Sequence, residues 1–357
     1  MKKLKFQDST FAYLGSKKKQ ASSISSFIDP AKHKALVSPF AGACSLELFV
    51  KHRLGLKCIV SDYSFVSYIA QRSLIANNGV KIERPDLIYL FTPNENPGLV
   101  KKKYSRFFSD QHCEFLDTST ENIRRLPEGA KKYLLFDLVC YFLTHALPFG
   151  KLGATYDTKN VREKGLIEAL QEASNSSESR VRKLIIANSH PLPVLEKLAN
   201  RINAGIISNN KTNHAYLEDA YKFLALPEIL EHADESVLFC DFPYAESSSY
   251  HSVYDSLSEI LLGREVKSEP SVFNSKEIEF WYDKFFELAQ PYDLWLFTMG
   301  AKVDNPNALH SARFLKMVQK HRPNGKLLKF ENFNWSINTL SGKSPKECEE
   351  FLVIAER

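Results

Sequence analysis

Asp241, Phe242, Pro243 and Tyr244 are the residues of this chain whose types and spacing most directly suggest chemistry. They follow an apolar run at 237–240 that is typical of a buried strand, and open α/β sheets bind their ligands at the carboxyl ends of strands. Asp241 can accept hydrogen bonds from an amino group, Pro243 fixes the backbone so that a carbonyl can accept another, and Tyr244 can stack on a flat heterocycle. These groups could bind the exocyclic amino group of a nucleobase, although such a tetrapeptide is also often only a turn.

A loop of small residues follows a predicted strand that begins at residue 35. Its residues Phe40, Ala41 and Gly42 let a ligand approach the backbone, and Ser45 is predicted to cap the helix that starts after it. The next predicted strand, 57–62, ends in Asp62, and an acid at the end of the second strand of a nucleotide-binding fold typically binds ribose hydroxyls. The loop lacks the three-glycine dinucleotide fingerprint, which disfavours a nicotinamide or flavin cofactor.

A third segment, which contains Tyr13, Gly15 and Lys17, precedes the first strand and by itself would be only a basic N-terminal segment. The chain therefore contains four motifs in order: Tyr-Leu-Gly-Ser-Lys, Pro-Phe-Ala-Gly, Ser-Asp-Tyr-Ser and Asp-Phe-Pro-Tyr. This ordered set resembles the Dam-like class of DNA adenine methyltransferases, which use S-adenosylmethionine as cofactor. The resemblance covers both ends of the chain and leaves its middle unmatched.

The resemblance implies a role for each matching residue. Tyr13, Gly15 and Lys17 would hold the amino-acid end of S-adenosylmethionine. The loop residues Phe40, Ala41 and Gly42 would line the cofactor, and Asp62 would bind its ribose. A looser match at 214–220 would place Asp219 beside the cofactor adenine, with an exposed helix-capping acid as the alternative. The catalytic group would comprise Asp241, the carbonyl of Phe242, Pro243 and Tyr244.

Two residues depart from the pattern of the family. Cys44 stands where the family loop usually has its last glycine, so a positive φ at this position would be strained. Phe242 replaces the first proline of the usual catalytic motif, which keeps the backbone carbonyl but loses rigidity. A catalytically degenerate DNA-binding relative therefore remains an alternative. Methylation of the cytosine amino group and an RNA substrate also remain open.

Composition sets limits on the class of protein. The 357 residues, 44% hydrophobic and 25% charged, can bury a large core, and the net charge of +5 suits a polyanionic partner. No segment approaches the roughly 20 apolar residues of a membrane helix and no signal peptide is evident, so we expect a cytoplasmic protein without membrane contact. The six cysteines and ten histidines show no metal-ligand spacing, so we expect no metal site.

The order of predicted elements indicates an α/β fold with a doubly wound, mostly parallel sheet and a mainly helical inserted domain, and the resemblance implies that this is a Rossmann-like methyltransferase sheet. The resemblance implies that residues 1–84 and 183–357 form the catalytic domain and that 85–182 form the inserted target-recognition domain. Further strands are predicted at 204–208, 237–240, 294–298, 326–330 and 351–355, and helices at 131–147, 275–290 and 307–321. Basic and aromatic residues alternate in the insertion, which favours double-stranded DNA as a partner. A companion restriction enzyme or defence-system subunit stays open.

Overall fold

The computed structural model describes residues 11, 13, 15–146, 186, 189–243, 250–266, 272–274, 277–302, 309–330, 334–335 and 346–357. These residues belong to two compact units. Unit 1 comprises Met1–Leu14, Ser64–Ile207 and Ser249–Ser268, and unit 2 comprises Gly15–Tyr63, Ser208–Ser248 and Glu269–Arg357. The predicted site residue Tyr244 lies outside the described residues.

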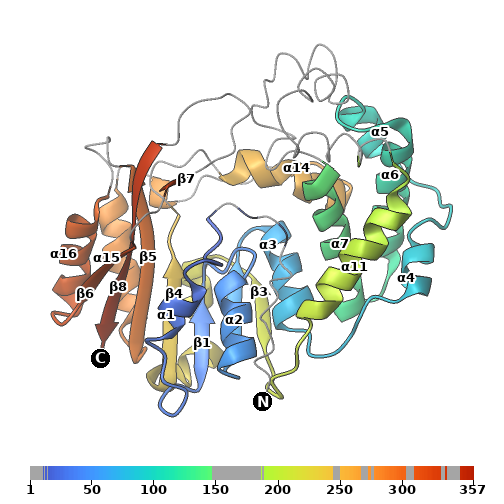
Figure 1. Ribbon diagram of the computed structural model, residues 1–357. Helices are drawn as coiled ribbons and strands as arrows, with labels where there is room; N and C mark the ends of the chain where they lie inside the picture. Colours follow the sequence, from blue (N-terminus) through green and yellow to red (C-terminus); the bar gives the residue numbers. More distant parts are fainter. Residues whose placement is uncertain are drawn as a thin grey trace. The chain divides into compact units, whose positions relative to one another are not determined.

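Unit 2 contains the sheet, whose strands run in the spatial order β3-β2-β1-β4-β5-β8-β6 within the described residues (Figure 1). The strands are β1 (Ala35–Ser38), β2 (Lys57–Asp62), β3 (His214–Leu217), β4 (Ser236–Asp241), β5 (Leu294–Lys302), β6 (Lys326–Phe330) and β8 (Lys346–Glu356), and β7 (Asn334–Trp335) pairs with β8. Neighbouring strands from β3 to β5 are parallel, whereas β8 is antiparallel to both β5 and β6.

The central strands are apolar because both of their faces are covered. All four residues of β1 are buried, and so are the first five residues of β4. A parallel strand between two helical layers has no solvent face, so it lacks the alternation of an exposed strand. The chain continues from β1 to β2 and β3 on one side, and β4 and β5 lie on the other. The order of strands therefore reverses between β1 and β4, which is where doubly wound sheets bind ligands.

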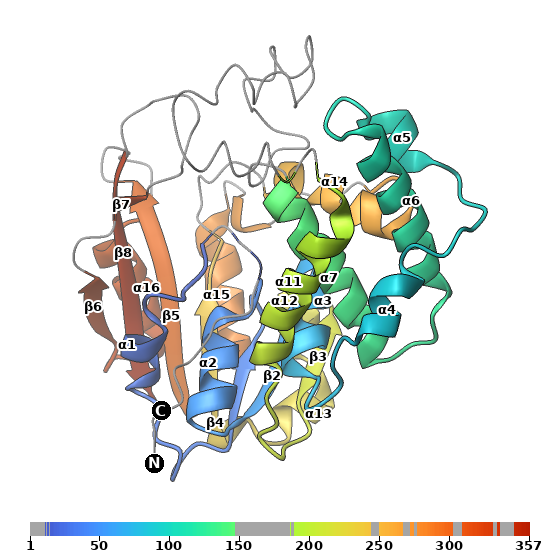
Figure 2. The ribbon, with the colours of Figure 1, turned by 45° about the vertical axis from the view of Figure 1, so that its right-hand side comes forward.

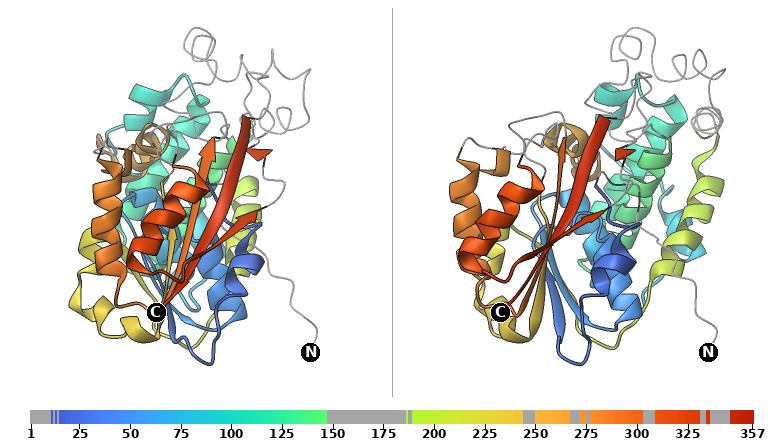
Figure 3. Two further views of the ribbon diagram at one scale, coloured as in Figure 1. Left: turned by 90° about the vertical axis from the view of Figure 1, so that its left-hand side faces the viewer. Right: turned by 60° about the vertical axis from the view of Figure 1, so that its left-hand side comes forward.

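Helices cover both faces of this sheet, with α1 (Ala21–Ser25) and α2 (Ser45–Arg53) on one face and α15 (Ile278–Ala289) and α16 (Ser311–His321) on the other (Figure 3). The helix α12 (Ala220–Leu224) packs against α15 and precedes α13 (Pro227–Leu230). Helix α16 is amphipathic, since it buries Phe314, Met317 and Val318, which recur at the spacing of one helical face. Short 3₁₀ turns occupy Ala233–Glu235 and Val272–Asn274.

Unit 1 is helical throughout its described secondary structure (Figure 2). Its elements are α3 (Phe65–Ala70), the π-helical turn η1 (Gln71–Ile75), α4 (Arg84–Tyr89), α5 (Leu99–Tyr104), α6 (Asp110–Arg125), α7 (Ala130–Ala146), α11 (Pro191–Gly205) and α14 (Tyr250–Leu262). Helix α7 is the core of this unit, because α3, α6, α11 and α14 all pack against it. It is apolar around most of its circumference, as expected of a helix surrounded by others.

The predicted α/β fold is confirmed, and so are the strands at 57–62, 237–240, 294–298, 326–330 and 351–355. The predicted strand at 204–208 is wrong, because α11 extends to Gly205 and the strand that pairs with β2 is His214–Leu217. Ser45 is the first residue of α2 and not its cap, a position that Cys44 occupies. The predicted insertion, 85–182, falls in unit 1, which also includes 64–84, 183–207 and 249–268.

No helix in the described part of the chain combines the length and the apolar character needed to span a membrane.

Candidate active site

The loop after β1 has a tight backbone that its small residues permit. Gly42 has φ 50° and Cys44 has φ 55°, both in the left-handed region. The N–H of Cys44 donates to the carbonyl of Ala41 at 2.7 Å, and the N–H of Ala41 donates to the carbonyl of Ser61 at 3.1 Å. Cys44 therefore has the positive φ that its position was expected to require if the loop follows the family geometry, a conformation that is disfavoured for a residue with a Cβ.

Asp62 ends β2 beside this loop. Its carboxylate accepts a hydrogen bond from the backbone N–H of Gly42 at 3.0 Å, and the residue is only 8% exposed. Because β1 and β2 are paired neighbours, with Ser38 opposite Val60, the loop and the acid meet at the same edge of the sheet. The Asp62 carboxylate thus has a hydrogen-bond partner in the loop, while its contact with the cofactor ribose stays a prediction.

The N-terminal motif is divided between the two units. Tyr13 belongs to unit 1, where its ring stacks on Tyr254 with centroids 4.8 Å apart and its hydroxyl accepts a hydrogen bond from Ser67 at 3.2 Å. Gly15 and Lys17 belong to unit 2. Gly15 has φ 81°, a conformation that requires glycine, and its carbonyl accepts a hydrogen bond from the ammonium of Lys17 at 3.0 Å.

Asp241 is bound through its carboxylate to Lys17 and Thr298. The Lys17 ammonium lies 2.7 Å from each carboxylate oxygen, and the hydroxyl of Thr298 donates to Oδ1 at 2.9 Å. Thr298 is positioned by the sheet, because it lies opposite Asp241 in the pairing of β4 with β5. A carboxylate offers about four acceptor positions, so these three contacts leave Asp241 able to accept from a further donor.

Electrostatics around Asp241 are set by burial and by neighbouring charges. Burial raises the pKa of Asp241 above its usual range, and the Lys17 ammonium counteracts this rise. Glu47, on α2 directly after the loop, is fully enclosed, and burial raises its pKa to about 7 even though the hydroxyl of Ser38 donates to it at 2.7 Å. Two carboxyl groups with raised pKa values therefore lie near the carboxyl ends of β1 and β4.

Phe242 is a core residue in this protein. Its side chain is 1% exposed and lies among the rings of Phe40, Phe273, Phe285 and others of the same cluster. Its backbone N–H donates to the carbonyl of Thr298 at 3.2 Å. The lost rigidity of the missing proline is thus offset by packing, because the ring and the N–H both anchor this residue. Pro243 is half-buried, and nothing is described for Tyr244.

Asp219 caps a helix. It is exposed, and its carboxylate accepts hydrogen bonds from the N–H groups of Tyr221 at 2.9 Å and Lys222 at 3.4 Å, at the start of α12. The alternative of an exposed helix-capping acid is therefore confirmed, whereas a contact with the cofactor adenine stays a prediction.

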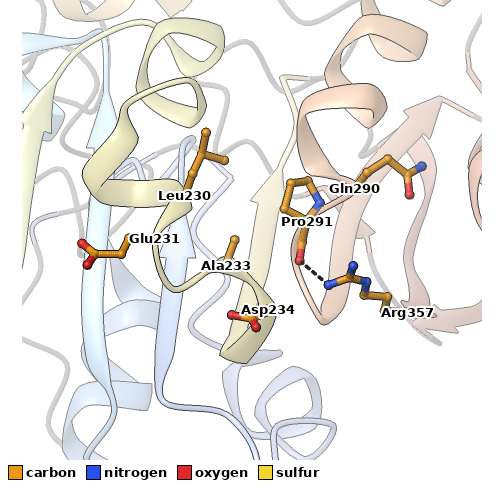
Figure 4. A pocket seen from close by; sticks show the side chains of 7 residues that line it. All are labelled: Leu230, Glu231, Ala233, Asp234, Gln290, Pro291 and Arg357. Atoms are coloured by element: carbon orange, nitrogen blue, oxygen red, sulfur yellow. Dashed lines mark hydrogen bonds between the residues drawn. The ribbon is translucent and has the colours of Figure 1, made fainter.

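A separate cavity of about 520 Å³ lies at the opposite edge of the sheet (Figure 4). It is lined by Leu230, Glu231, Ala233, Asp234, Gln290, Pro291 and Arg357, residues that precede β4 and β5 or follow β8. On one side of it, the Arg357 guanidinium donates to the carbonyl of Pro291. This cavity is therefore not the site at the carboxyl ends of the strands. Within the described residues, no group of three or more His, Cys, Asp or Glu side chains is arranged to hold a metal ion.

Comparison with known proteins identifies a family that matches part of this chain. Residues 13–184, which include the N-terminal motif, the loop after β1 and Asp62, match the family of D12 class N6 adenine-specific DNA methyltransferases. The matched residues make up just under half of the 357-residue chain, and over this part the chain is similar to that family. The match supports the methylation of adenine in DNA by this chain, which confirms the predicted Dam-like resemblance and favours adenine over cytosine. No curated protein matches the chain at a significant level.

In this adenine methyltransferase the fold brings most of the predicted site residues of unit 2 to one edge of the sheet. Phe40, Ala41, Gly42, Asp62 and Asp241 all lie at or just after the carboxyl ends of β1, β2 and β4. Lys17 reaches the same place from the segment before α1, through its contact with Asp241.

Sequence analysis missed two residues that lie against Asp241 or Lys17, namely Thr298 and Glu350. Thr298 is a polar residue at the end of a predicted strand, which is a signal that could have identified it. Glu350 is 2% exposed on β8 and forms an ion pair with Lys17 at 3.1 Å. It precedes an apolar run without any motif around it, so the sequence offers no comparable signal.

Proposed function

We propose that this adenine methyltransferase transfers a methyl group from S-adenosylmethionine to the exocyclic amino nitrogen of an adenine that has been flipped out of double-stranded DNA. The observation that carries this proposal is the position of Asp241 at the end of β4, next to the loop that follows β1. The strand order reverses there, and doubly wound sheets bind ligands at that point.

The residues around the loop fit S-adenosylmethionine by their chemistry. Ala41 and Gly42 carry little or no side chain, so a ligand can approach their backbone. The Asp62 carboxylate can accept hydrogen bonds from ribose hydroxyls, and we propose Tyr13, Gly15 and Lys17 for the amino-acid end of the cofactor. When bound, S-adenosylmethionine would supply a methyl group on a sulfonium, and the electron pair of the broken C–S bond would return to sulfur.

Asp241 would act on the amino group of the target base. The lone pair of that nitrogen is delocalised into the ring, and hydrogen bonds from its two N–H groups to Asp241 and to the carbonyl of Phe242 would localise the pair on nitrogen. The carboxylate would also stabilise the positive charge that develops when nitrogen forms its bond to the methyl carbon, until a proton leaves. Asp241 must be ionised for both tasks, so its raised pKa matters for the reaction.

The target base must leave the duplex, because a stacked adenine cannot reach a site at the edge of a sheet. We propose that Tyr244 stacks on the flipped base, which would contribute roughly 1–3 kcal/mol of binding free energy. Pro243 would fix the backbone between the carbonyl of Phe242 and this ring. The remaining contribution of the protein to the rate would come mainly from aligning the methyl group of S-adenosylmethionine with the target nitrogen.

We propose that residues 85–182 supply much of the DNA-binding surface, and ion pairs limit which basic residues can do so. Arg124 and Arg125 bind Glu121, Lys131 binds Asp86, and Lys132 binds Glu128, with N···O distances of 2.6–2.8 Å. A lysine or arginine that is already ion-paired with a carboxylate gains less free energy from contact with a DNA phosphate. Lys101 and Lys102, two exposed lysines of α5, are better candidates, as the salt-dependent term of DNA binding requires accessible charge.

Methylation-sensitive sequencing of DNA from cells that express the chain tests this function. The proposal predicts methylated adenines in a fixed sequence context, absent from cells that express an Asp241→Ala variant. Methylated cytosine or methylated RNA would identify another substrate, and unmodified nucleic acid would indicate a degenerate relative. If a restriction enzyme accompanies the chain, the methylated sequence would be the one that this enzyme cuts.

A further inference from the structure

Lys17 lies between two carboxylates in unit 2, and only one of them belongs to the catalytic motif. Its ammonium is 2.7 Å from Asp241 Oδ1 and 3.1 Å from Glu350 Oε1. Glu350 lies on β8, the antiparallel strand of the sheet, and Gln20 donates to its Oε2 at 2.9 Å. One lysine therefore connects the catalytic acid to a second acid from a distant part of the chain.

The two carboxylates differ in their access to a ligand. The side chain of Asp241 is 21% exposed, whereas those of Lys17 and Glu350 are 3% and 2% exposed. An incoming amino group could therefore meet Asp241, while Glu350 faces Lys17 and Gln20 in the interior. A charge buried at this depth is stable only when it is paired, and Lys17 provides that pairing for both acids.

The charges of Asp241, Lys17 and Glu350 indicate how Glu350 would assist methyl transfer. With all three ionised, two carboxylates and one ammonium leave one net negative charge. Asp241 and Lys17 alone would have no net charge. The carboxylate would attract the positive charge that develops on the target nitrogen, but the ammonium would repel it. This repulsion is strong in a site of low dielectric constant, so a neutral pair would stabilise a cationic amino nitrogen poorly.

We propose that Glu350 is a positioning residue for methyl transfer, which holds the Lys17 ammonium and offsets its charge so that Asp241 presents net negative charge to the target amino group. The inference rests on the proposed function, because it needs Asp241 to act on that amino group. Glu350 itself touches neither the base nor the cofactor.

The pH dependence of the reaction separates this role from a purely structural one. Among the described residues, the titratable groups that face Asp241 are Lys17, Glu350, Glu47 and Cys240. The negative charge of Glu350 is one of the causes that raise the pKa of Asp241. Replacing Glu350 with glutamine should therefore lower that pKa and move the acid limb of the rate profile to lower pH. A loss of packing would not produce this shift.

The test compares steady-state kinetics of the full chain on DNA for four variants and the wild type. Glu350→Gln should lower kcat about tenfold to a hundredfold, as losing a partner that orients a functional group commonly does, with unchanged KM for DNA and S-adenosylmethionine. Glu350→Asp keeps the charge and should recover part of the rate. Glu356→Gln, at an exposed position of the same strand, should behave as wild type. Asp241→Asn completes the set, and thermal unfolding of each variant checks its fold.

A wild-type kcat and acid limb for Glu350→Gln would overturn the inference, and so would a loss that appears only in KM or in thermal stability. The Asp241→Asn variant separates this outcome from failure of the proposed function. If Asp241→Asn is inactive while Glu350→Gln is fully active, only the role of Glu350 falls. If Asp241→Asn methylates DNA at the wild-type rate, the proposed function of Asp241 falls, and the role of Glu350 with it.

Discussion

The rings of Phe40 and Phe242 lie 5.2 Å apart, tilted by 50°. Phe40 belongs to the loop after β1, which we propose for the cofactor, and Phe242 belongs to the catalytic tetrapeptide. Both rings pack on Phe273 and Phe285, so one aromatic cluster supports the two halves of the site in unit 2. A change at Phe242 should therefore affect stability as well as chemistry.

Phe242→Pro should destabilise unit 2, even though proline is the usual residue of the family at this position. The change removes a fully buried ring, and loss of a buried phenylalanine typically costs about 3–5 kcal/mol. It also removes the N–H that donates to the carbonyl of Thr298. Urea unfolding should give a lower midpoint for Phe242→Pro than for Phe280→Ala, a control at a side chain that is 51% exposed. Equal midpoints for the two variants would contradict the role of the cluster.

Sequence patterns predicted the centre of the sheet well, because strands such as β1 and β4 are buried on both faces and form continuous apolar runs. The exception, 204–208, shows the limit of such reasoning. The short apolar run there continues the end of an amphipathic helix, and a run of this length does not distinguish a strand from a helix end. The pairing strand, His214–Leu217, is only four residues long and lies half-buried at the edge of the sheet, so its apolar run is too short to stand out.

The candidate site was predictable where motifs mark it and unpredictable where tertiary contacts create it. Asp62 and Asp241 end predicted strands, so their shared edge follows from the parallel sheet. The contact of Lys17 with Glu350 joins residues 333 positions apart and depends on β8 being inserted between β5 and β6. The packing of Phe242 likewise depends on helix α15, which no local pattern connects to it.

Asp62 variants should separate cofactor binding from loop stability. Asp62→Ala leaves the N–H of Gly42 without its acceptor, so it should weaken both the fold and the binding of S-adenosylmethionine, each by about 1–3 kcal/mol. Asp62→Asn keeps an acceptor for that N–H and should preserve stability while still weakening cofactor binding. Calorimetric titration and thermal unfolding measure the two effects. Wild-type cofactor affinity in both variants would remove Asp62 from the cofactor site.

Asp137, in α7 of unit 1, should make stability depend on pH. It is completely buried, the hydroxyl of Ser73 donates to it at 2.5 Å, and burial raises its pKa to about 7. Between the unfolded value of 3.8 and about 7 the folded state binds the additional proton, so this group lowers stability as pH rises through that window.

Asp137→Asn does not titrate, so its stability relative to wild type should increase from pH 4 to pH 8, by at most about 4 kcal/mol for a shift of this size. Denaturant unfolding at both pH values measures the difference. A constant difference between the two proteins across this range would show that Asp137 is ionised in the folded state.

The lysines of α5 should differ in their effect on DNA binding. Lys103 forms an ion pair with Glu259 at 2.5 Å, and Glu259 is only 6% exposed, so Lys103→Gln should mainly reduce stability. Replacing Lys101 and Lys102 together with glutamine should weaken DNA binding and reduce the slope of log affinity against log salt by about 1 per lost phosphate contact. Fluorescence titration of labelled DNA at several salt concentrations measures this slope. An unchanged affinity and slope would mean that neither lysine contacts a phosphate of the DNA.

The central claim is that Asp241 stabilises the amino group of the target adenine during methyl transfer. The most direct measurement is single-turnover incorporation of labelled methyl groups into DNA by Asp241→Ala, beside calorimetric binding of S-adenosylmethionine to the same variant. The account predicts that incorporation is lost while most cofactor affinity remains, because the interaction with the nitrogen strengthens only as its charge develops. Incorporation at the wild-type rate by Asp241→Ala would contradict the account.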